Sequence, residues 1–540
     1  MTPEQLADLD TAARQMAGTH LRALLATPGR FATHSRRLGP LLLDLSKQKW
    51  DEDVLARLGG IAEDCGWRRA RDAMFAGEAI NRSEGRAVLH TALRAAGSAL
   101  PSPAPAAVRA EIDATLRRMA DLVDALERDT GAFGLPQGIT DVVNLGIGGS
   151  DLGPRLAVEA LADFHSGRFC CHFLPNVDGT EMAALMRRLD PRKTLVLVVS
   201  KSFTTQETLL NGAVLRQWIE STYDGDAAAA ARHFVAVSAN VDAARAFGIP
   251  SERVLPMWDF VGGRYSVWSA VGLIVALAVG MPHFRSFLAG AALVDDHFRT
   301  APWRDNLPVL LALAGIWNRN GLGHPSLAVI PYADRLRELP AFLQQLEMES
   351  LGKRVSGRGE AVAQATVPVL WGNVGTNAQH AFFQALHQGT DVVPVDFIGV
   401  VRPGHALRAN HEALLANLLA QGAAFALGKT FEQALAEAPA GEESARHALA
   451  AQRTFPGNRP SSTILLDALT PESLGALLAL YEHKVFVQAV LWDLNAFDQW
   501  GVELGKTLAR AILPALAASG DSSGFDASTR GLIESVRALG

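Results

Sequence analysis

Short apolar runs that alternate with segments of helical composition constrain the fold of this 540-residue chain more than any other feature. The runs are rich in Val, Leu and Ile on both faces, which is typical of strands buried on both sides of a sheet. The helical segments between them favour parallel strands joined by helices. The sequence therefore predicts an α/β fold with strands at 141–147, 169–175, 194–200, 233–239, 253–257, 327–332, 367–372, 392–400 and 462–469.

These strands fall into two groups, separated by a helical stretch near 284–320. Residues 1–95 are mostly helical in pattern, and the Pro-rich stretch 98–108 predicts a connection. A further helical segment begins near residue 471. We therefore expect two α/β domains between helical ends.

Composition excludes several classes of protein. The formal net charge is −6, and no run of Lys and Arg is present, which argues against a nucleic-acid partner. Cys65, Cys170 and Cys171 form no C-x-x-C motif, which argues against disulfides and zinc and fits a reducing cytoplasm. The first residues lack the apolar stretch of a signal peptide, and the apolar segment 267–281 is short enough to predict a buried helix rather than a membrane span.

A cluster of hydroxyl side chains follows the strand expected at 194–200: Ser200, Ser202, Thr204 and Thr205. The Gly-rich stretch 144–153 follows another strand, and each is followed by an expected helix. Ligands gather at the carboxyl ends of parallel strands, where helix N-termini offer free N–H groups. We interpret both stretches as a phosphate site. The alternative is that Ser200 and Thr204 cap a helix, although a cap needs only one hydroxyl.

Three glycine-containing stretches resemble nucleotide-binding sequences without matching them. Gly146 and Gly148 fit the dinucleotide fingerprint, but Asp151 occupies the third glycine position and would repel a pyrophosphate. An NAD-dependent oxidoreductase is therefore the weaker alternative. The segment 501–507 resembles a P-loop with one residue too few between its glycines, and Ala423 replaces the first glycine before a second Gly-Lys-Thr.

The histidines do not predict a metal centre. His380 and His387 lie seven residues apart, and on one helix they would be separated by about 10 Å of rise. One ion could not bind both, so we expect no catalytic metal. A single histidine of this kind is also consistent with a hydrogen-bonded structural role.

Three segments carry side chains suited to proton transfer. The apolar spacing of 339–354 predicts a helix with Gln345 and Glu349 on one flank, where a partly desolvated Glu349 could act as a base or remain a boundary residue. Arg264 follows two glycines and could stabilise an oxyanion, or form a salt bridge in a turn. The segment 497–506 gathers Gln499, Glu503 and Lys506, as an ordinary amphipathic helix also could.

Taken together, these stretches resemble the glucose-6-phosphate isomerase family, also called phosphoglucose isomerases. The segments that carry the resemblance stand in family order at 74–94, 144–154, 200–208, 258–273, 344–353, 375–390 and 497–506. Gly-Gly-Arg-Tyr-Ser and Phe-Asp-Gln-Trp-Gly-Val-Glu-Leu-Gly-Lys are far more specific than any single glycine motif. One departure is Ser202, where many members have Thr, and it keeps the hydroxyl.

The resemblance implies two sugar-isomerase (SIS) α/β sandwich domains with parallel sheets, which we place at 109–283 and 284–490. A helical N-terminal region at 1–108 and a helical C-terminal arm at 491–540 flank them. It also implies a homodimer with shared active sites, and interconversion of D-glucose 6-phosphate and D-fructose 6-phosphate without a cofactor, through ring opening and a cis-enediolate. Glycolysis and gluconeogenesis are the implied pathways.

The resemblance also assigns roles to individual residues. The phosphate would lie near Gly149 and against Ser150, Ser200, Lys201, Ser202, Thr204 and Thr205. Glu349 matches the base that moves a proton between C1 and C2, and Arg264 matches the cation beside the enediolate. His387 and Lys506 match the groups that assist ring opening, while Gln345 and Gln499 match substrate-contacting amides. A sugar-phosphate sensor without catalysis would keep the hydroxyl loop but would not need Glu349, Arg264, His387 and Lys506.

Overall fold

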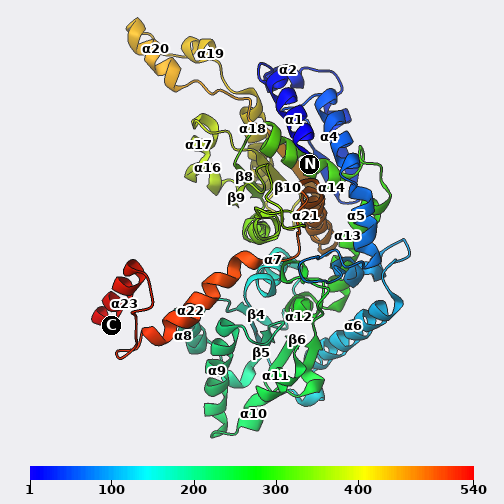
Figure 1. Ribbon diagram of the computed structural model, residues 1–540, viewed down its shortest axis with the longest axis vertical. Coiled ribbons are helices and arrows are strands. Elements are labelled where there is room, and N and C mark those ends of the chain that lie inside the picture. The colour runs from blue at the N-terminus through cyan, green and yellow to red at the C-terminus, as the bar shows by residue number, and fades with distance from the viewer. The chain divides into compact units, whose positions relative to one another are not determined.

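The computed structural model describes residues 1–540 (Figure 1). Its contacts divide the chain into two units, Met1–Ala496 and Phe497–Gly540. The larger unit holds both sheets, and the smaller one consists of α22 (Glu503–Ala515), α23 (Ala527–Leu539) and a short turn before them.

The first sheet contains five parallel strands in the order β4-β3-β5-β6-β7. They are β3 (Asp141–Leu145), β4 (Cys170–Phe173), β5 (Thr194–Val199), β6 (Phe234–Ser238) and β7 (Val254–Pro256). The five strands predicted in this part of the sequence are thus confirmed. The helices between them are α7 (Leu152–Ala160), α8 (Gly179–Arg188), α9 (Gln206–Glu220), α10 (Ala227–Ala231) and α11 (Val241–Ala246).

The second sheet has six strands in the order β1-β2-β11-β10-β8-β9. Its four parallel strands, all predicted, are β8 (Ser326–Tyr332), β9 (Val369–Gly372), β10 (Val395–Arg402) and β11 (Ser461–Ala468). The associated helices are α15 (Leu339–Leu343), α16 (Asn377–Ala381), α17 (Phe383–Gln388), α18 (Arg408–Leu427), α19 (Phe431–Ala436) and α20 (Glu443–Gln452).

The N-terminal region supplies two strands that the sequence analysis did not identify. β1 (Ser35–Leu38) and β2 (Leu41–Asp44) form a hairpin, and β2 pairs antiparallel with β11. A short hairpin strand such as β1, with two arginines, carries no apolar run to reveal it. The rest of this region is mostly helical, as predicted: α1 (Pro3–Met16), α2 (Leu21–Leu25), α3 (Arg30–His34), α4 (Glu52–Asp64) and α5 (Trp67–Ala76). Helix α6 (Ala106–Glu127) follows the Pro-rich connection.

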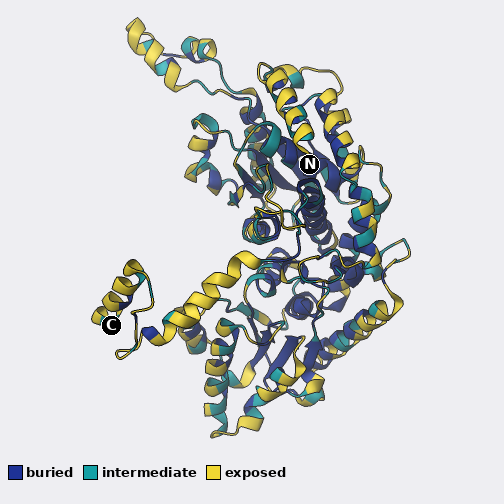
Figure 2. Ribbon diagram, in the orientation of Figure 1, coloured by how far each residue is buried: buried dark blue, intermediate teal, exposed yellow.

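Apolar helices form a second core beside the sheets (Figure 2). They are α12 (Leu273–Val279), α13 (Met281–Thr300), α14 (Leu307–Ile316) and α21 (Pro471–Trp492). Every residue of α12 is buried, which confirms the buried helix expected near 267–281. Helices α13 and α21 approach at backbone distance, because a Cβ added at Gly290 would lie 1.8 Å from the Glu472 carbonyl oxygen.

One helix, Pro471–Trp492, is long and apolar enough to cross a membrane by length and composition. Of its apolar window, 94% is buried inside the protein, as in the core helix of many globular proteins.

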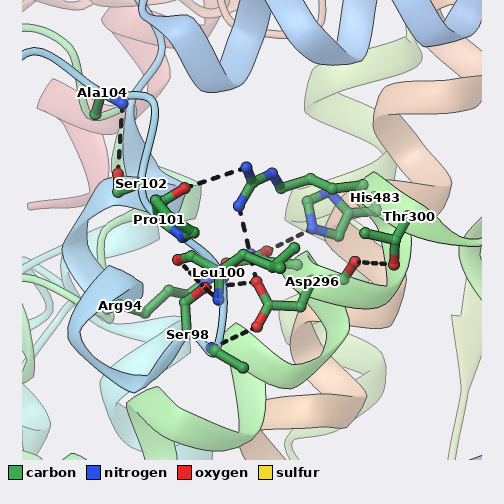
Figure 3. A network of polar contacts seen from close by, with 12 residues as sticks. Arg94, Ser98, Leu100, Pro101, Ser102, Ala104, Asp296, Thr300 and His483 are labelled. Atoms are coloured by element: carbon green, nitrogen blue, oxygen red, sulfur yellow. Dashed lines mark hydrogen bonds and ion pairs between the residues drawn. The ribbon is translucent and has the colours of Figure 1, made fainter.

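Polar contacts join the segment before α6 to α13 (Figure 3). The Ser98 hydroxyl donates to Asp296 Oδ1 at 2.5 Å, and the Ala99 amide donates to Asp296 Oδ2 at 2.7 Å. One residue earlier on α13, Asp295 accepts two 2.6 Å hydrogen bonds from buried Arg94. Paired donors of this kind satisfy charges that would otherwise be costly to bury.

Candidate functional site

The Gly-rich loop and the hydroxyl loop lie at neighbouring strand ends. β3 pairs in parallel with β5, so their carboxyl ends meet at the same edge of the first sheet. After β3 the chain passes through the short turn Gly148–Ser150 into α7, and after β5 it passes through residues 200–205 into α9. This is the edge at which ligands bind in parallel α/β sheets.

The hydroxyls of the second loop are paired with one another. Ser200 Oγ lies 3.2 Å from Thr205 Oγ1, and Ser202 Oγ lies 2.6 Å from Thr204 Oγ1. Thr205 is the N-cap residue of α9, yet its side chain makes no capping hydrogen bond. The alternative that Ser200 and Thr204 cap the helix is therefore wrong. The loop combines hydroxyls with a helix N-terminus, which is a chemical setting suited to an anion.

Lys201 connects this loop to the segment that leads to Arg264. Its ammonium lies 3.3 Å from the carbonyl oxygens of Asp259 and Val261, and 3.3 Å from a carboxylate oxygen of Asp259. Burial lowers the pKa of Lys201, while the Asp259 carboxylate opposes that effect. The side chain therefore has protein partners in this structure in addition to any role toward a ligand.

Two glycine turns touch at backbone distance. The turn Gly148–Ser150 packs against the turn Gly263–Tyr265, and a Cβ added at Gly149 would lie 2.0 Å from the carbonyl carbon of Gly263. A Cβ at Gly148 would lie 2.9 Å from Gln345 Nε2. Glycine thus brings together three segments that are far apart in the sequence.

Arg264 and Glu349 form the charged centre of this arrangement. Arg264 Nη1 lies 3.1 Å from Glu349 Oε2, and Arg264 Nε donates to Ser350 Oγ at 2.7 Å. Arg264 also donates to the Ala496 carbonyl. The Arg264 side chain is 1% exposed and that of Glu349 is 21% exposed, so the cation is fixed while the carboxylate remains accessible.

Glu349 belongs to a π-helical turn, Gln344–Glu349, that continues α15. The apolar positions of the predicted helix are buried, as expected, at Leu339, Phe342, Leu343 and Leu346. The prediction that Gln345 and Glu349 lie on a regular α-helix is wrong, because their segment has π-helical geometry. π-turns inside helices occur frequently at functional sites.

The structure corrects two expectations about His387. His380 and His387 lie on separate helices, α16 and α17, because the backbone leaves helical geometry at Phe382. His387 Nε2 lies 2.8 Å from Gln421 Oε1, and its ring centroid is 4.2 Å from that of Phe425. Gly389 follows His387 closely and predicts a helix end there, where the helix dipole would stabilise the protonated form. Burial among these groups instead lowers the pKa of His387.

Three further residues from the sequence analysis are Gln499, Lys506 and Asp151. Gln499 and Lys506 belong to the unit Phe497–Gly540, in which Lys506 forms an exposed ion pair of 2.8 Å with Glu503. Asp151 is buried, pairs with Arg155 at 2.9 Å, and has a pKa raised by burial. No group of three or more His, Cys, Asp or Glu residues is arranged to hold a metal ion.

Sequence reasoning missed the residues that support the charged centre. Ser350 accepts from Arg264, and the Tyr265 hydroxyl lies 2.9 Å from Ser350 Oγ. Lys484 forms a buried ion pair of 2.6 Å with Glu347, inside the π-turn. The adjacency of Tyr265 to Arg264 and of Ser350 to Glu349 was a usable signal, but nothing in the sequence points from Lys484 to a residue 137 positions away.

Fold and site together define an α/β protein with a hydroxyl-rich loop at a sheet edge and a carboxylate–guanidinium pair. The family model of phosphoglucose isomerase matches residues 44–533. Glucose-6-phosphate isomerases from Leptothrix cholodnii and Xanthobacter autotrophicus are 50% and 49% identical, over 95% and 96% of this chain and 94% of each relative. The chain belongs to the phosphoglucose isomerase family.

Solved structures agree with this assignment. The crystal structure of a glucose-6-phosphate isomerase from Chlamydia trachomatis superposes with a TM-score of 0.85, at 34% identity and 99% coverage of both chains. A hypothetical protein from Thermus thermophilus superposes with a TM-score of 0.65, at 26% identity, and covers 88% of this chain and 99% of its own.

Proposed function

We propose that this protein interconverts D-glucose 6-phosphate and D-fructose 6-phosphate, as a cofactor-independent aldose–ketose isomerase in glycolysis and gluconeogenesis. The observation that carries the proposal is the Arg264–Glu349 pair, in contact with a glycine turn at the anion-binding sheet edge of a chain from this family. Moving one proton between adjacent carbons needs a single base and a cation for the enediolate, and this pair contains both groups.

The phosphate group binds at the two strand-end loops. Hydroxyls, backbone N–H groups and one ammonium replace its hydration, and they come from Gly149, Ser150, Ser200, Lys201, Ser202, Thr204 and Thr205. Binding at this distance from the reacting carbons orients the open-chain sugar. The pairing of Thr205 Oγ1 with Ser200 Oγ at 3.2 Å supports this role, because it keeps two hydroxyls together beside the N-terminus of α9 without a capping bond.

Glu349 takes the proton from one carbon and returns it to its neighbour, while Arg264 offsets the charge of the cis-enediolate. Gln345 contacts the substrate from the same π-turn. The accessibility of Glu349 beside a buried Arg264 supports this division of roles.

His387 and Lys506 assist ring opening, and Gln499 contacts the substrate. The family resemblance supports a role of His387 in the active site of a second copy of the chain, and contacts with Gln421 and Phe425 fix the orientation of its ring. The proposal therefore includes a homodimer with shared active sites, which rests on the family resemblance. The lowered pKa of His387 gives a neutral imidazole near pH 7, which can accept a proton before it donates one.

We propose the same domain division as from the sequence: a mostly helical region at 1–108 that also contains the β1–β2 hairpin, SIS domains at 109–283 and 284–490, and a C-terminal arm at 491–540. The sugar phosphates it uses are intracellular metabolites, so we place the protein in the cytoplasm. No nucleic acid, membrane, metal or organic cofactor takes part.

The direct test is an assay of the purified protein that couples consumption of fructose 6-phosphate to detection of glucose 6-phosphate. Glu349→Gln removes the base and keeps the shape, so turnover should fall by about 10² to 10⁴ while sugar-phosphate binding persists. Full activity in that variant would refute the base assignment. An inactive wild-type protein that still binds sugar phosphate would instead indicate a sensor without catalysis.

A further inference from the structure

Helix α21 carries three consecutive ionisable residues that the proposed reaction does not use. Glu482, His483 and Lys484 are 1%, 0% and 2% exposed. Burying ionised groups costs several kcal/mol unless each finds a partner with good geometry. Each of the three has such a partner, and each partner stands on a different element.

Lys484 reaches the turn that carries the proposed base. Its ammonium lies 2.6 Å from Glu347 Oε1, and the two side chains are 2% and 1% exposed. Glu347 stands midway between Gln345 and Glu349 on the π-turn Gln344–Glu349. The ion pair therefore fixes the centre of the turn on the buried side, while Gln345 and Glu349 belong to the side near the glycine turn and Arg264.

Glu482 reaches the segment that carries Arg264. Its Oε1 accepts from Trp268 Nε1 at 2.7 Å, and its Oε2 accepts from Arg94 Nη1 at 2.6 Å. Trp268 stands four residues after Arg264 and is fully buried. Helix α21 thus contacts the segments that carry both partners of the Arg264–Glu349 pair, through side chains two positions apart.

Packing alone does not require this ion pair, since two apolar side chains of similar volume could fill the same space. The charged pair also restricts the orientation of both side chains. The Lys484 ammonium has three N–H donors, and the Glu347 carboxylate has few alternative partners in the buried interior. Asp396, which is also buried, faces the same ammonium and accepts from the Tyr481 hydroxyl at 3.2 Å.

We propose that Lys484 is a positioning residue that sets Glu349 against Arg264 by holding Glu347. The proposal rests on the isomerase function given above. It separates substrate binding, which belongs to the strand-end loops, from proton transfer, which depends on the placement of the carboxylate to a fraction of an ångström.

The test replaces the ion pair as a unit. The double variant Glu347→Gln with Lys484→Met removes both charges of the pair and keeps both lengths, so neither partner is left charged without the other. Asp396 keeps its hydrogen bond from the Tyr481 hydroxyl. We expect its thermal midpoint to stay close to that of the wild type. Its kcat should fall at least about tenfold with KM for fructose 6-phosphate unchanged, since a misplaced catalytic group lowers turnover and not ground-state binding.

The matched control is His483→Gln, on the same helix and equally buried. His483 Nε2 lies 2.6 Å from Asp295 Oδ1, on α13 and not on the π-turn. This variant should lose thermal stability while its kcat stays within twofold of the wild type. If the double variant does not fold, Lys484→Arg keeps the charge and changes the donor geometry, and the same loss of kcat at constant KM is expected.

The outcomes are distinguishable. A kcat within twofold of the wild type in the folded pair variant, or a rise in KM alone, would overturn the positioning role and leave a structural ion pair. An inactive wild-type protein would overturn the proposed function instead.

Discussion

At the scale of one residue, the contacts of Arg264 explain why lysine cannot replace it. Its guanidinium donates at once to Glu349, Ser350 and the Ala496 carbonyl, in the fixed fork geometry that only arginine provides. The sequence identified Arg264 from its two preceding glycines. It could not identify the acceptors as a group, because Glu349 lies 85 positions away.

Arg264→Lys should therefore impair turnover more than binding. A lysine can reach one of these acceptors but not all three, and the enediolate loses a directed cation. We expect kcat to fall by about 10² or more, the loss typical of removing one donor to a developing anion. Steady-state kinetics with fructose 6-phosphate measure this, and a kcat like that of the wild type would contradict the role.

The hydroxyl loop predicts the opposite kinetic pattern. Ser200 and Thr205 contact one another at 3.2 Å and would contact the phosphate in the ground state and the transition state alike. The double change Ser200→Ala with Thr205→Ala should mainly raise KM and leave kcat near its original value. A fall in kcat at constant KM would show that these hydroxyls act on the chemical step.

At the scale of elements, the site depends on two turns whose backbones are in direct contact at glycine residues. The turn Gly148–Ser150 and the turn Gly263–Tyr265 come from different parts of the first α/β region and touch through Gly149 and Gly263. The glycines in the sequence indicate both turns. Their contact could not be predicted, because it depends on the tertiary packing of the strand ends. The π-turn of Gln344–Glu349 left no sign in the apolar spacing, since its buried positions also fit an α-helix.

Gly149→Ala should disturb this contact. The added Cβ would lie 2.0 Å from backbone that cannot rotate away, so one turn must shift. We expect a loss of about 1–3 kcal/mol in stability, typical of overpacking, together with lower activity. The control is Gly60→Ala in α4, where no atom lies within 4 Å of the added Cβ and where alanine favours the helix. Denaturant unfolding of both variants measures the difference. Equal unfolding midpoints for Gly149→Ala and Gly60→Ala would contradict the close contact.

At the scale of the whole molecule, buried neutral histidines connect stability to pH. Burial lowers the pKa of His324 to about 4, helped by nearby Lys49 and Arg459. Between the ordinary histidine pKa and that value, the unfolded chain binds a proton that the folded chain does not bind. Stability therefore falls as the pH drops through this interval, and the stabilising effect is fully present only above it.

His324→Gln should flatten this dependence. We expect the wild type to lose about 1–3 kcal/mol more than the variant between pH 7 and pH 4, from the size of the pKa difference. Urea unfolding at a series of pH values measures both slopes. Parallel slopes would mean that His324 is not a source of the acid sensitivity.

The sequence by itself determined nine strands, their α/β order, the two strand-end loops and the family, because apolar runs, glycines and hydroxyls act over short distances along the chain. Tertiary structure alone decided that β1 and β2 extend the second sheet, that Arg264 contacts Glu349, and that Lys484 holds Glu347. These contacts join residues far apart in the sequence. Their selection depends on packing and desolvation in three dimensions, which leave no periodic signal along the chain.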